Sequence, residues 1–169
     1  MSVHINKSTV LVLSGISGSG KSTFAKKLCE EVLGRVAVVS ADDHFIDPYT
    51  QEYAFKPAEL GLAHAECLRA FNTLMAPQET TLVIVDNTNT QNWERAPYMA
   101  LGMAYGFDTW LVDLHVSPEV AHARNVHGVP LKAIESMALR IEEPPRIWQY
   151  QALRDGMTAK DLLTTIKAV

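Results

Sequence analysis

The chain has 169 residues, 47% of them hydrophobic and 20% charged, which is typical of a globular domain and excludes a disordered protein. Its net charge of −4 excludes an extended basic surface that binds along a nucleic acid, but it is compatible with local binding of one strand end. Cys29 and Cys67 lack metal-ligand spacing, and no signal-peptide pattern or long apolar span occurs. We therefore expect one cytoplasmic domain over residues 1–169, with two buried thiols, no membrane segment and no obligate protein partner.

Short apolar runs alternate with helical patterns along the chain. Four runs predict strands: Thr9–Ser14, 36–40, Leu82–Asp86 and 109–115. Helices are predicted after Gly20, from Pro57, from about Gln91 to Tyr105 with Gly106 as the stop, from Ser117, from Pro130 and from Thr158 onward. Strands that are apolar on both faces belong in a parallel sheet with helices on both sides. The sequence therefore predicts a three-layer α/β/α fold with a mainly parallel sheet and crossover helices.

Residues 15–22, GISGSGKS, fit the phosphate-binding pattern G-x-x-x-x-G-K-[ST] between a predicted strand and a predicted helix. The glycines let successive backbone N–H groups curl around a phosphate, and the helix N-terminus adds partial positive charge. Lys21 is expected to reach the β- and γ-phosphates of ATP, and the Ser22 hydroxyl to ligate Mg²⁺. The predicted nucleotide ligands in this segment are Gly15, Ser17, Gly18, Ser19, Gly20, Lys21, Ser22 and Thr23. The pattern indicates a P-loop NTPase fold.

Two acidic residues follow the second predicted strand, within the sequence SADDH. The carboxyl ends of parallel strands form the edge at which open α/β sheets bind ligands. Asp42 is predicted to be the base that takes the proton from an attacking hydroxyl, as the catalytic aspartate of a kinase does. Asp43 is expected to assist a metal-bound water or to hold a substrate-facing group. An aspartate-rich turn that caps the next segment is the other interpretation of this pair.

The third predicted strand ends in an acidic residue, Asp86, after four apolar residues. This is the Walker B pattern, so Asp86 is predicted to orient Mg²⁺. Asn87 and Asn89 follow directly, and Arg95 lies a short distance beyond them. These three residues would either contact the substrate or cap the next helix.

A lid is predicted over approximately residues 124–143, because Arg124 precedes a short loop that contains Gly128. Such a lid closes over the phosphates and excludes water, which protects ATP from hydrolysis. Arg124 is predicted to bind the nucleotide and to offset the charge on the transferred phosphoryl group. Arg140, farther along the same segment, is a second candidate for a nucleotide contact.

Four segments in this order carry a family resemblance: GISGSGKST, SADDHF, DNTNTQNWER, and ARNVHGVP followed by IESMALRIE. The chain resembles the P-loop kinases related to the 5′-hydroxyl polynucleotide kinases of bacteriophage and their small single-domain relatives. The resemblance implies ATP- and Mg²⁺-dependent phosphorylation of a hydroxyl. It places the general base on Asp42, the lid arginine on Arg124, and the P-loop lysine and serine on Lys21 and Ser22.

The chain departs from that family at two places. The Asp-Thr-Asn motif of the phage enzymes is replaced by Asn87-Thr88-Asn89, with Asp86 one residue earlier. Phe45 stands where those enzymes carry an arginine that helps to hold the substrate's phosphate. The resemblance implies the 5′-hydroxyl of DNA or RNA as the acceptor, whereas Phe45 counts against it and leaves a nucleoside or other small alcohol as the alternative. The non-enzymatic alternative is a regulatory module that binds a nucleotide and has no transferase activity.

Overall fold

The computed structural model describes residues 3–76, 80–154 and 156–167. In chain order the strands are β1 (Val3–His4), β2 (Thr9–Ser14), β3 (Val32–Leu33), β4 (Val36–Val39), β5 (Leu82–Asp86), β6 (Asp108–Leu114) and β7 (Gln149–Leu153). The helices are α1 (Lys21–Glu31), the 3₁₀ turns η1 (Ala41–Phe45) and η2 (Pro57–Glu59), α2 (Leu60–Met75), α3 (Asn92–Ala104), α4 (Pro118–Arg124), α5 (Leu131–Leu139) and α6 (Ala159–Lys167). All four predicted strands are confirmed to within one residue.

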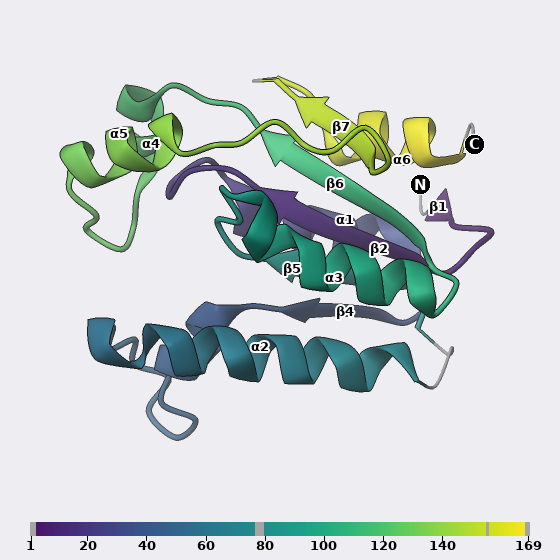
Figure 1. The fold of residues 1–169 in the computed structure, drawn as a ribbon, viewed down its shortest axis with the longest axis horizontal. Helices are drawn as coiled ribbons and strands as arrows, with labels where there is room; N and C mark the ends of the chain where they lie inside the picture. Colours follow the sequence, from purple (N-terminus) through teal and green to yellow (C-terminus); the bar gives the residue numbers. More distant parts are fainter. Residues whose placement is uncertain (1–2, 77–79, 155, 168–169) are drawn as a thin grey trace.

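The main sheet has five parallel strands in the order β4-β5-β2-β6-β7, with β2 in the centre (Figure 1). One face packs against α2 and α3 through a core that includes Phe71 and Met99. The other face packs against α1 and α6, through residues such as Leu28 and Leu162. The predicted three-layer fold is therefore confirmed. Its central strands are buried on both faces, which explains why they have near-continuous apolar sequences.

Three strands were not predicted. β1 and β3 have two residues each and pair only with one another, so neither gives a readable pattern. β7, with the sequence QYQAL, forms the edge of the main sheet beside β6. Because only Leu153 in it is buried, its sequence lacks the apolar run by which the other strands were found. The expectation of two buried thiols was also wrong for Cys29, which is exposed, and right for Cys67.

The helices α4 and α5 lie beyond the carboxyl ends of the strands, at the upper left of Figure 1. Ala121 of α4 and Ile134 of α5 form a small apolar cluster with Ile16 of the P-loop. This cluster is separate from the two cores that cover the sheet, so the lid segment rests on the P-loop through few buried residues. Within the described residues, none of the helices combines the length and the hydropathy needed to cross a membrane.

Candidate active site

The P-loop connects β2 to α1, and two of its glycines, Gly18 and Gly20, have left-handed backbone conformations. Gly18 has φ +82°, and a Cβ at this position would collide with the carbonyl group of Ala121 in α4. Gly20, also left-handed with φ 95°, precedes α1, whose first turn is not capped by any described side chain. The backbone N–H groups at this helix end therefore remain available to phosphate oxygens.

Lys21 lies in the centre of the loop. Its ammonium group donates to the carbonyl oxygens of Gly15 (2.9 Å) and Ile16 (3.0 Å) and to the Ser19 hydroxyl (3.4 Å). Burial lowers the pKa of Lys21 from 10.5 to about 8, although the carboxylates of Asp86, Asp42 and Asp113 oppose this shift. A phosphate is a stronger partner for an ammonium group than a carbonyl oxygen, because it carries charge.

Ser22 and Asp86 meet at the end of the central strands, and the Ser22 hydroxyl is hydrogen-bonded to the Asp86 carboxylate. Burial is the largest influence on Asp86 and raises its pKa, while the bond from Ser22 and the charge of Lys21 lower it. A hydroxyl and a carboxylate are oxygen ligands of the kind that Mg²⁺ prefers. These residues therefore fit the Mg²⁺ ligands predicted from the sequence, and that assignment stays a prediction.

Asp42 and Asp43 lie on η1, directly after β4. The Asp43 carboxylate accepts from the backbone N–H of Ser40 (3.2 Å), and the Ser40 hydroxyl accepts from Asp42 N, which closes a capping box. Asp43 therefore serves the turn, as the alternative interpretation predicted, and burial raises the pKa of its carboxyl. Asp42 is exposed, and its charge is near enough to affect the pKa values of both Lys21 and Asp86.

Asn87 and Asn89, predicted to face the substrate, are buried and hold the neighbouring backbone. The Asn87 Oδ1 accepts from Ala41 N (2.8 Å), and its Nδ2 donates to the Cys67 thiol (3.4 Å). The Asn89 Nδ2 donates to the carbonyl of Leu13 (2.8 Å). Asn87 thus fixes the start of η1, and Asn89 fixes the strand that leads into the P-loop. Both side chains position the site rather than line it.

Arg95 is fully buried, at 0% exposure, and the prediction that it contacts substrate needs correction. Its guanidinium donates to the carbonyls of Asn89 (2.6 Å), Thr90 (3.1 Å) and Glu142 (2.7 Å), to the Ser14 hydroxyl (2.9 Å) and to Asn92 Oδ1 (3.1 Å). These five bonds use the whole donor set of the guanidinium, so none remains for a ligand. Arg95 instead joins β2, the loop before α3 and the C-terminal end of the lid segment.

The lid reaches the P-loop from the other side. Asn125, which follows α4, donates to the Ser17 hydroxyl at 3.4 Å. Arg124, the last residue of α4, lines a pocket beside the P-loop, and its nucleotide contact stays a prediction. Arg140, the other predicted nucleotide ligand, is exposed at the end of α5 and does not line this pocket.

The pocket beside the P-loop has a volume of about 340 Å³. Ser19, Gly20 and Thr23 form its P-loop side, and residues from the β7–α6 loop form the opposite side: Arg154, Gly156, Met157 and Thr158. The sequence analysis missed this second group because it follows β7, the edge strand that was not predicted.

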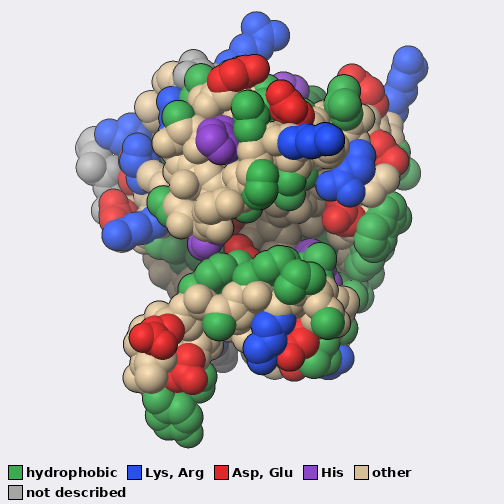
Figure 2. Space-filling view, turned by 90° about the vertical axis from the view of Figure 1, so that its left-hand side faces the viewer, with side chains coloured by type: hydrophobic (Ala, Val, Ile, Leu, Met, Phe, Trp, Pro, Cys, Tyr) green, Lys and Arg blue, Asp and Glu red, His purple; other side chains and the backbone are tan. Residues whose placement is uncertain are grey.

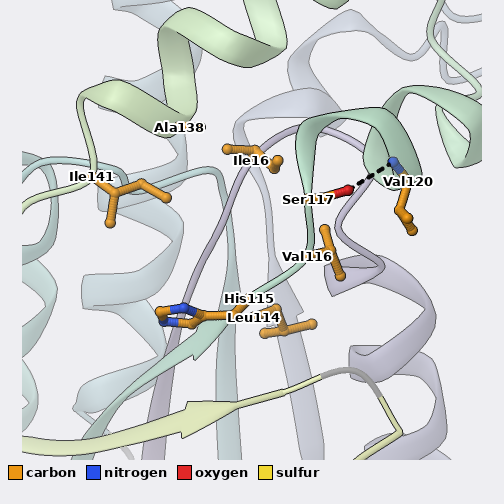
Figure 3. A pocket seen from close by; sticks show the side chains of 8 residues that line it. All are labelled: Ile16, Leu114, His115, Val116, Ser117, Val120, Ala138 and Ile141. Atoms are coloured by element: carbon orange, nitrogen blue, oxygen red, sulfur yellow. Dashed lines mark hydrogen bonds between the residues drawn. The ribbon is translucent and has the colours of Figure 1, made fainter.

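A second cavity, of about 410 Å³, lies between the P-loop and the lid (Figure 3). Ile16 faces Ala138 and Ile141 of the lid segment across it, and His115 enters from the end of β6 (Figure 3). The His115 Nε2 lies 3.0 Å from Oδ2 of the buried Asp113, which orients the ring. The lid therefore meets the core across a partly hollow, largely apolar interface.

The loop of residues 46–56 and the start of α2 form a lobe on the other side of Asp42. Figure 2 shows the molecule hollowed between this lobe and the rest of the surface, with acidic and histidine side chains along the hollow. Tyr53 crosses it: its hydroxyl donates to Asp42 Oδ1 (3.1 Å), and its ring contacts that of His127 in the lid, with 4.8 Å between centroids. Tyr49 points to solvent, with 93% exposure.

Strand order, P-loop and acidic residues at the sheet edge together define a P-loop kinase-like nucleotide-binding domain. The sequence model of the family described as AAA domain matches residues 10–144. The chain belongs to this family.

Two human proteins illustrate the relatives by sequence. NEDD4-binding protein 2 from Homo sapiens is 34% identical over 139 residues, which cover 76% of this chain and 7% of that protein. YLP motif-containing protein 1 from Homo sapiens is 25% identical over 157 residues, which cover 81% of this chain and 7% of that protein. The chain thus spans only a small part of the length of these relatives.

Solved structures share the fold at low identity. Kti12 from Chaetomium thermophilum, in complex with ADP-AlF3, has a TM-score of 0.68 at 16% identity, covering 93% of this chain and 96% of that chain. The APS kinase CysC from Mycobacterium tuberculosis, in complex with AMPPNP and APS, has a TM-score of 0.61 at 20% identity and covers 95% of each chain. A gluconokinase from Sinorhizobium meliloti 1021 has a TM-score of 0.59 at 18% identity, covering 97% of this chain and 92% of that chain.

Proposed function

We propose that the protein is a phosphotransferase that moves the γ-phosphate of ATP to a hydroxyl group, with Asp42 as the base. The observation that carries this proposal is the position of Asp42, exposed at the sheet edge within electrostatic range of the P-loop Lys21 and of Asp86. A purely regulatory nucleotide switch would not need an open carboxylate at that place. The structural likeness to kinases supports the same class of reaction.

The chemistry follows from the named groups. The P-loop N–H groups and Lys21 would hold the β- and γ-phosphates, and the pocket lined by Arg124 would hold the rest of ATP. Mg²⁺ held by Ser22 and Asp86 would neutralise charge on the phosphate oxygens. Asp42 accepts the proton of the attacking hydroxyl, a bond forms from that oxygen to the γ-phosphorus, and the bond to the bridging oxygen breaks to release ADP.

The 5′-hydroxyl of DNA or RNA is the acceptor that we propose. The resemblance to the polynucleotide kinases extends through four segments in the same order, and it includes the base and the lid arginine. Phe55 lies half-exposed on the lobe and could stack against a terminal base. Such an end-on grip does not need an extended basic groove, which agrees with the net charge of −4.

A small alcohol is the second candidate, and Phe45 is the observation that favours it. Phe45 is buried and packs edge-to-face on Phe55, with 5.0 Å between ring centroids, so this position offers no positive charge to a substrate phosphate. The APS kinase and the gluconokinase, which share the fold, act on small molecules by their names.

Transfer of label from γ-labelled ATP to a panel of acceptors tests the proposal. The panel contains 5′-hydroxyl DNA and RNA oligonucleotides, adenosine and gluconate, each with Mg²⁺. We expect label on the 5′ ends of the oligonucleotides, lost in Lys21→Ala and kept in Lys160→Ala, a matched change at an exposed lysine of α6.

The panel separates the candidate functions. Label on adenosine or gluconate alone would replace the polynucleotide acceptor with a small alcohol. Protein that binds ATP but labels no acceptor would contradict the phosphotransferase and support the regulatory module.

A further inference from the structure

Tyr53 makes a contact that the proposed chemistry does not use. Its hydroxyl donates to Oδ1 of Asp42 at 3.1 Å. An acceptor hydroxyl must donate to this same carboxylate before it can lose its proton to it. The phenol group therefore lies where an acceptor hydroxyl would be deprotonated.

The loop that carries Tyr53 is held by its own backbone. Tyr53 forms an antiparallel bridge with Ile46, and Ala54 N donates to the carbonyl of Phe45 (2.9 Å). At the tip, the Asp47 carboxylate accepts from the N–H groups of Tyr49 and Thr50, at 2.8 Å each. With the backbone fixed in this way, rotation of the side chain alone can release the contact with Asp42.

The ring of Tyr53 also faces the lid. Its centroid lies 4.8 Å from that of His127, in the loop that follows α4, and 6.2 Å from that of Phe45 beneath it. The phenol ring is thus held between His127 of the lid and Phe45 of η1, and its hydroxyl donates to the Asp42 carboxylate. Opening the lid would remove one of these contacts and loosen the ring.

We propose that the Tyr53 hydroxyl occupies the acceptor's place at Asp42 when no acceptor is bound, and that the acceptor hydroxyl must displace it. This inference rests on the proposed function, because it assigns Asp42 as the base. The Tyr53 hydroxyl would then compete with the acceptor for Asp42, so the acceptor must bind strongly enough to displace it.

The arrangement has a second consequence, for water. Water at Asp42 could lose a proton to it while its oxygen attacks the γ-phosphorus, which would release ADP and phosphate without an acceptor. While the Tyr53 hydroxyl donates to Oδ1 of Asp42, it competes with water for that carboxylate oxygen. The contact would therefore suppress ATP hydrolysis in the absence of acceptor.

The inference can be distinguished from a role in which Tyr53 only orients Asp42, because the two predict opposite changes in ATP hydrolysis when the phenol hydroxyl is removed. If the phenol only orients Asp42, its removal misplaces the base, so both acceptor phosphorylation and ATP hydrolysis fall. If it competes with the acceptor, its removal raises hydrolysis and lowers the KM for the acceptor.

The experiment compares wild type, Tyr53→Phe and Tyr105→Phe in two assays: Mg²⁺-ATP hydrolysis without acceptor, and transfer to a 5′-hydroxyl DNA oligonucleotide. Tyr105 is a matched control, because it is 39% exposed against 38% for Tyr53 and lies at the C-terminal end of α3. Loss of one hydrogen bond to a charged group predicts about tenfold faster hydrolysis and about tenfold lower KM in Tyr53→Phe, with kcat nearly unchanged.

His127→Ala keeps the phenol but removes its ring contact, so it should shift hydrolysis in the same direction by a smaller factor. Transfer that proceeds in all variants, with equal hydrolysis and KM in wild type and Tyr53→Phe, would overturn the inference and leave the proposed function standing. A fall in hydrolysis and kcat in Tyr53→Phe would assign Tyr53 a positioning role and overturn it as well. Absence of transfer and hydrolysis in every variant that binds ATP would instead overturn the proposed function, and the inference with it.

Discussion

The phosphate-binding side and the acceptor side of the site are stabilised in different ways. Around β2 and β5, the buried polar side chains of Arg95, Asn87 and Asn89 form hydrogen bonds with neighbouring backbone groups. On the acceptor side, the exposed Asp42 carboxylate is met by the half-exposed Tyr53, and the lid touches the P-loop through the Asn125–Ser17 bond. The phosphate side is therefore rigid before any ligand binds, whereas the acceptor side is closed by contacts that a ligand can replace.

Among the substitutions considered, replacement of Arg95 on the phosphate-binding side should lower the free energy of unfolding most. Arg95→Met leaves the Ser14 hydroxyl and the carbonyls of Asn89, Thr90 and Glu142 without their buried donor. We expect the free energy of unfolding to fall by about 4 kcal/mol, measured by urea denaturation. Arg146→Met, at an exposed position, should change it by less than about 0.5 kcal/mol.

Should Arg95→Met fail to fold, Arg95→Lys keeps the charge and loses the planar fork, and it should still be clearly destabilised. A normal unfolding free energy together with lost acceptor binding would show instead that Arg95 contacts substrate.

Substitution of Asn87 tests how the phosphate-binding side of the site supports the acceptor side. Asn87→Ala leaves the N–H of Ala41 unpaired where η1 begins, so we expect a loss of about 2 kcal/mol in the free energy of unfolding. Transfer should also slow, because η1 carries Asp42. Asn72→Ala, on the exposed side of α2, is the matched control. Unchanged stability in Asn87→Ala would mean that η1 is held without this bond.

The smallest expected effect is at His44 of η1, whose ring contacts acidic residues of η2 and α2. Its Nδ1 lies 2.6 Å from Glu66 of α2 and its Nε2 3.1 Å from Glu59 of η2, and Lys56 also pairs with Glu59. The bonds to Glu66 and then Glu59 raise the pKa of His44 above its usual 6.5. A raised pKa in the folded state means that this stabilisation is complete below pH 6.5 and is lost as the pH rises through the folded-state value.

Urea midpoints of wild type and His44→Gln check this at pH 5.5 and pH 9. The advantage of wild type should be larger at pH 5.5 than at pH 9, and an equal difference at the two pH values would contradict the ion-paired histidine.

Sequence patterns predicted the strands and the P-loop on the phosphate-binding side well, because each of these is encoded by a short continuous stretch of residues. The P-loop and the strands β2 and β5 carry continuous motifs, and their burial on both faces gives an apolar sequence that is easily recognised. The positions of Asp42 and Asp86 directly after predicted parallel strands were also sufficient to predict that both lie at one edge of the sheet, because the carboxyl ends of parallel strands meet there.

Long-range contacts could not be predicted in the same way. The role of Arg95 depends on Ser14 and Glu142, which are far from it in sequence, and an arginine that follows a strand is equally compatible with a ligand contact. Tyr53 meets Asp42 only because the loop of residues 46–56 folds back through the bridge to Ile46. The β7–α6 side of the pocket depended on an edge strand without an apolar pattern.

The most direct test of Asp42 as the base separates nucleotide binding from transfer in Asp42→Asn. The Kd for ATP would be measured by calorimetry, and single-turnover transfer by labelled ATP with a 5′-hydroxyl oligonucleotide. We predict a Kd close to that of wild type and transfer slower by about a thousandfold, because the amide cannot accept the proton. Transfer at the wild-type rate in Asp42→Asn would contradict the account.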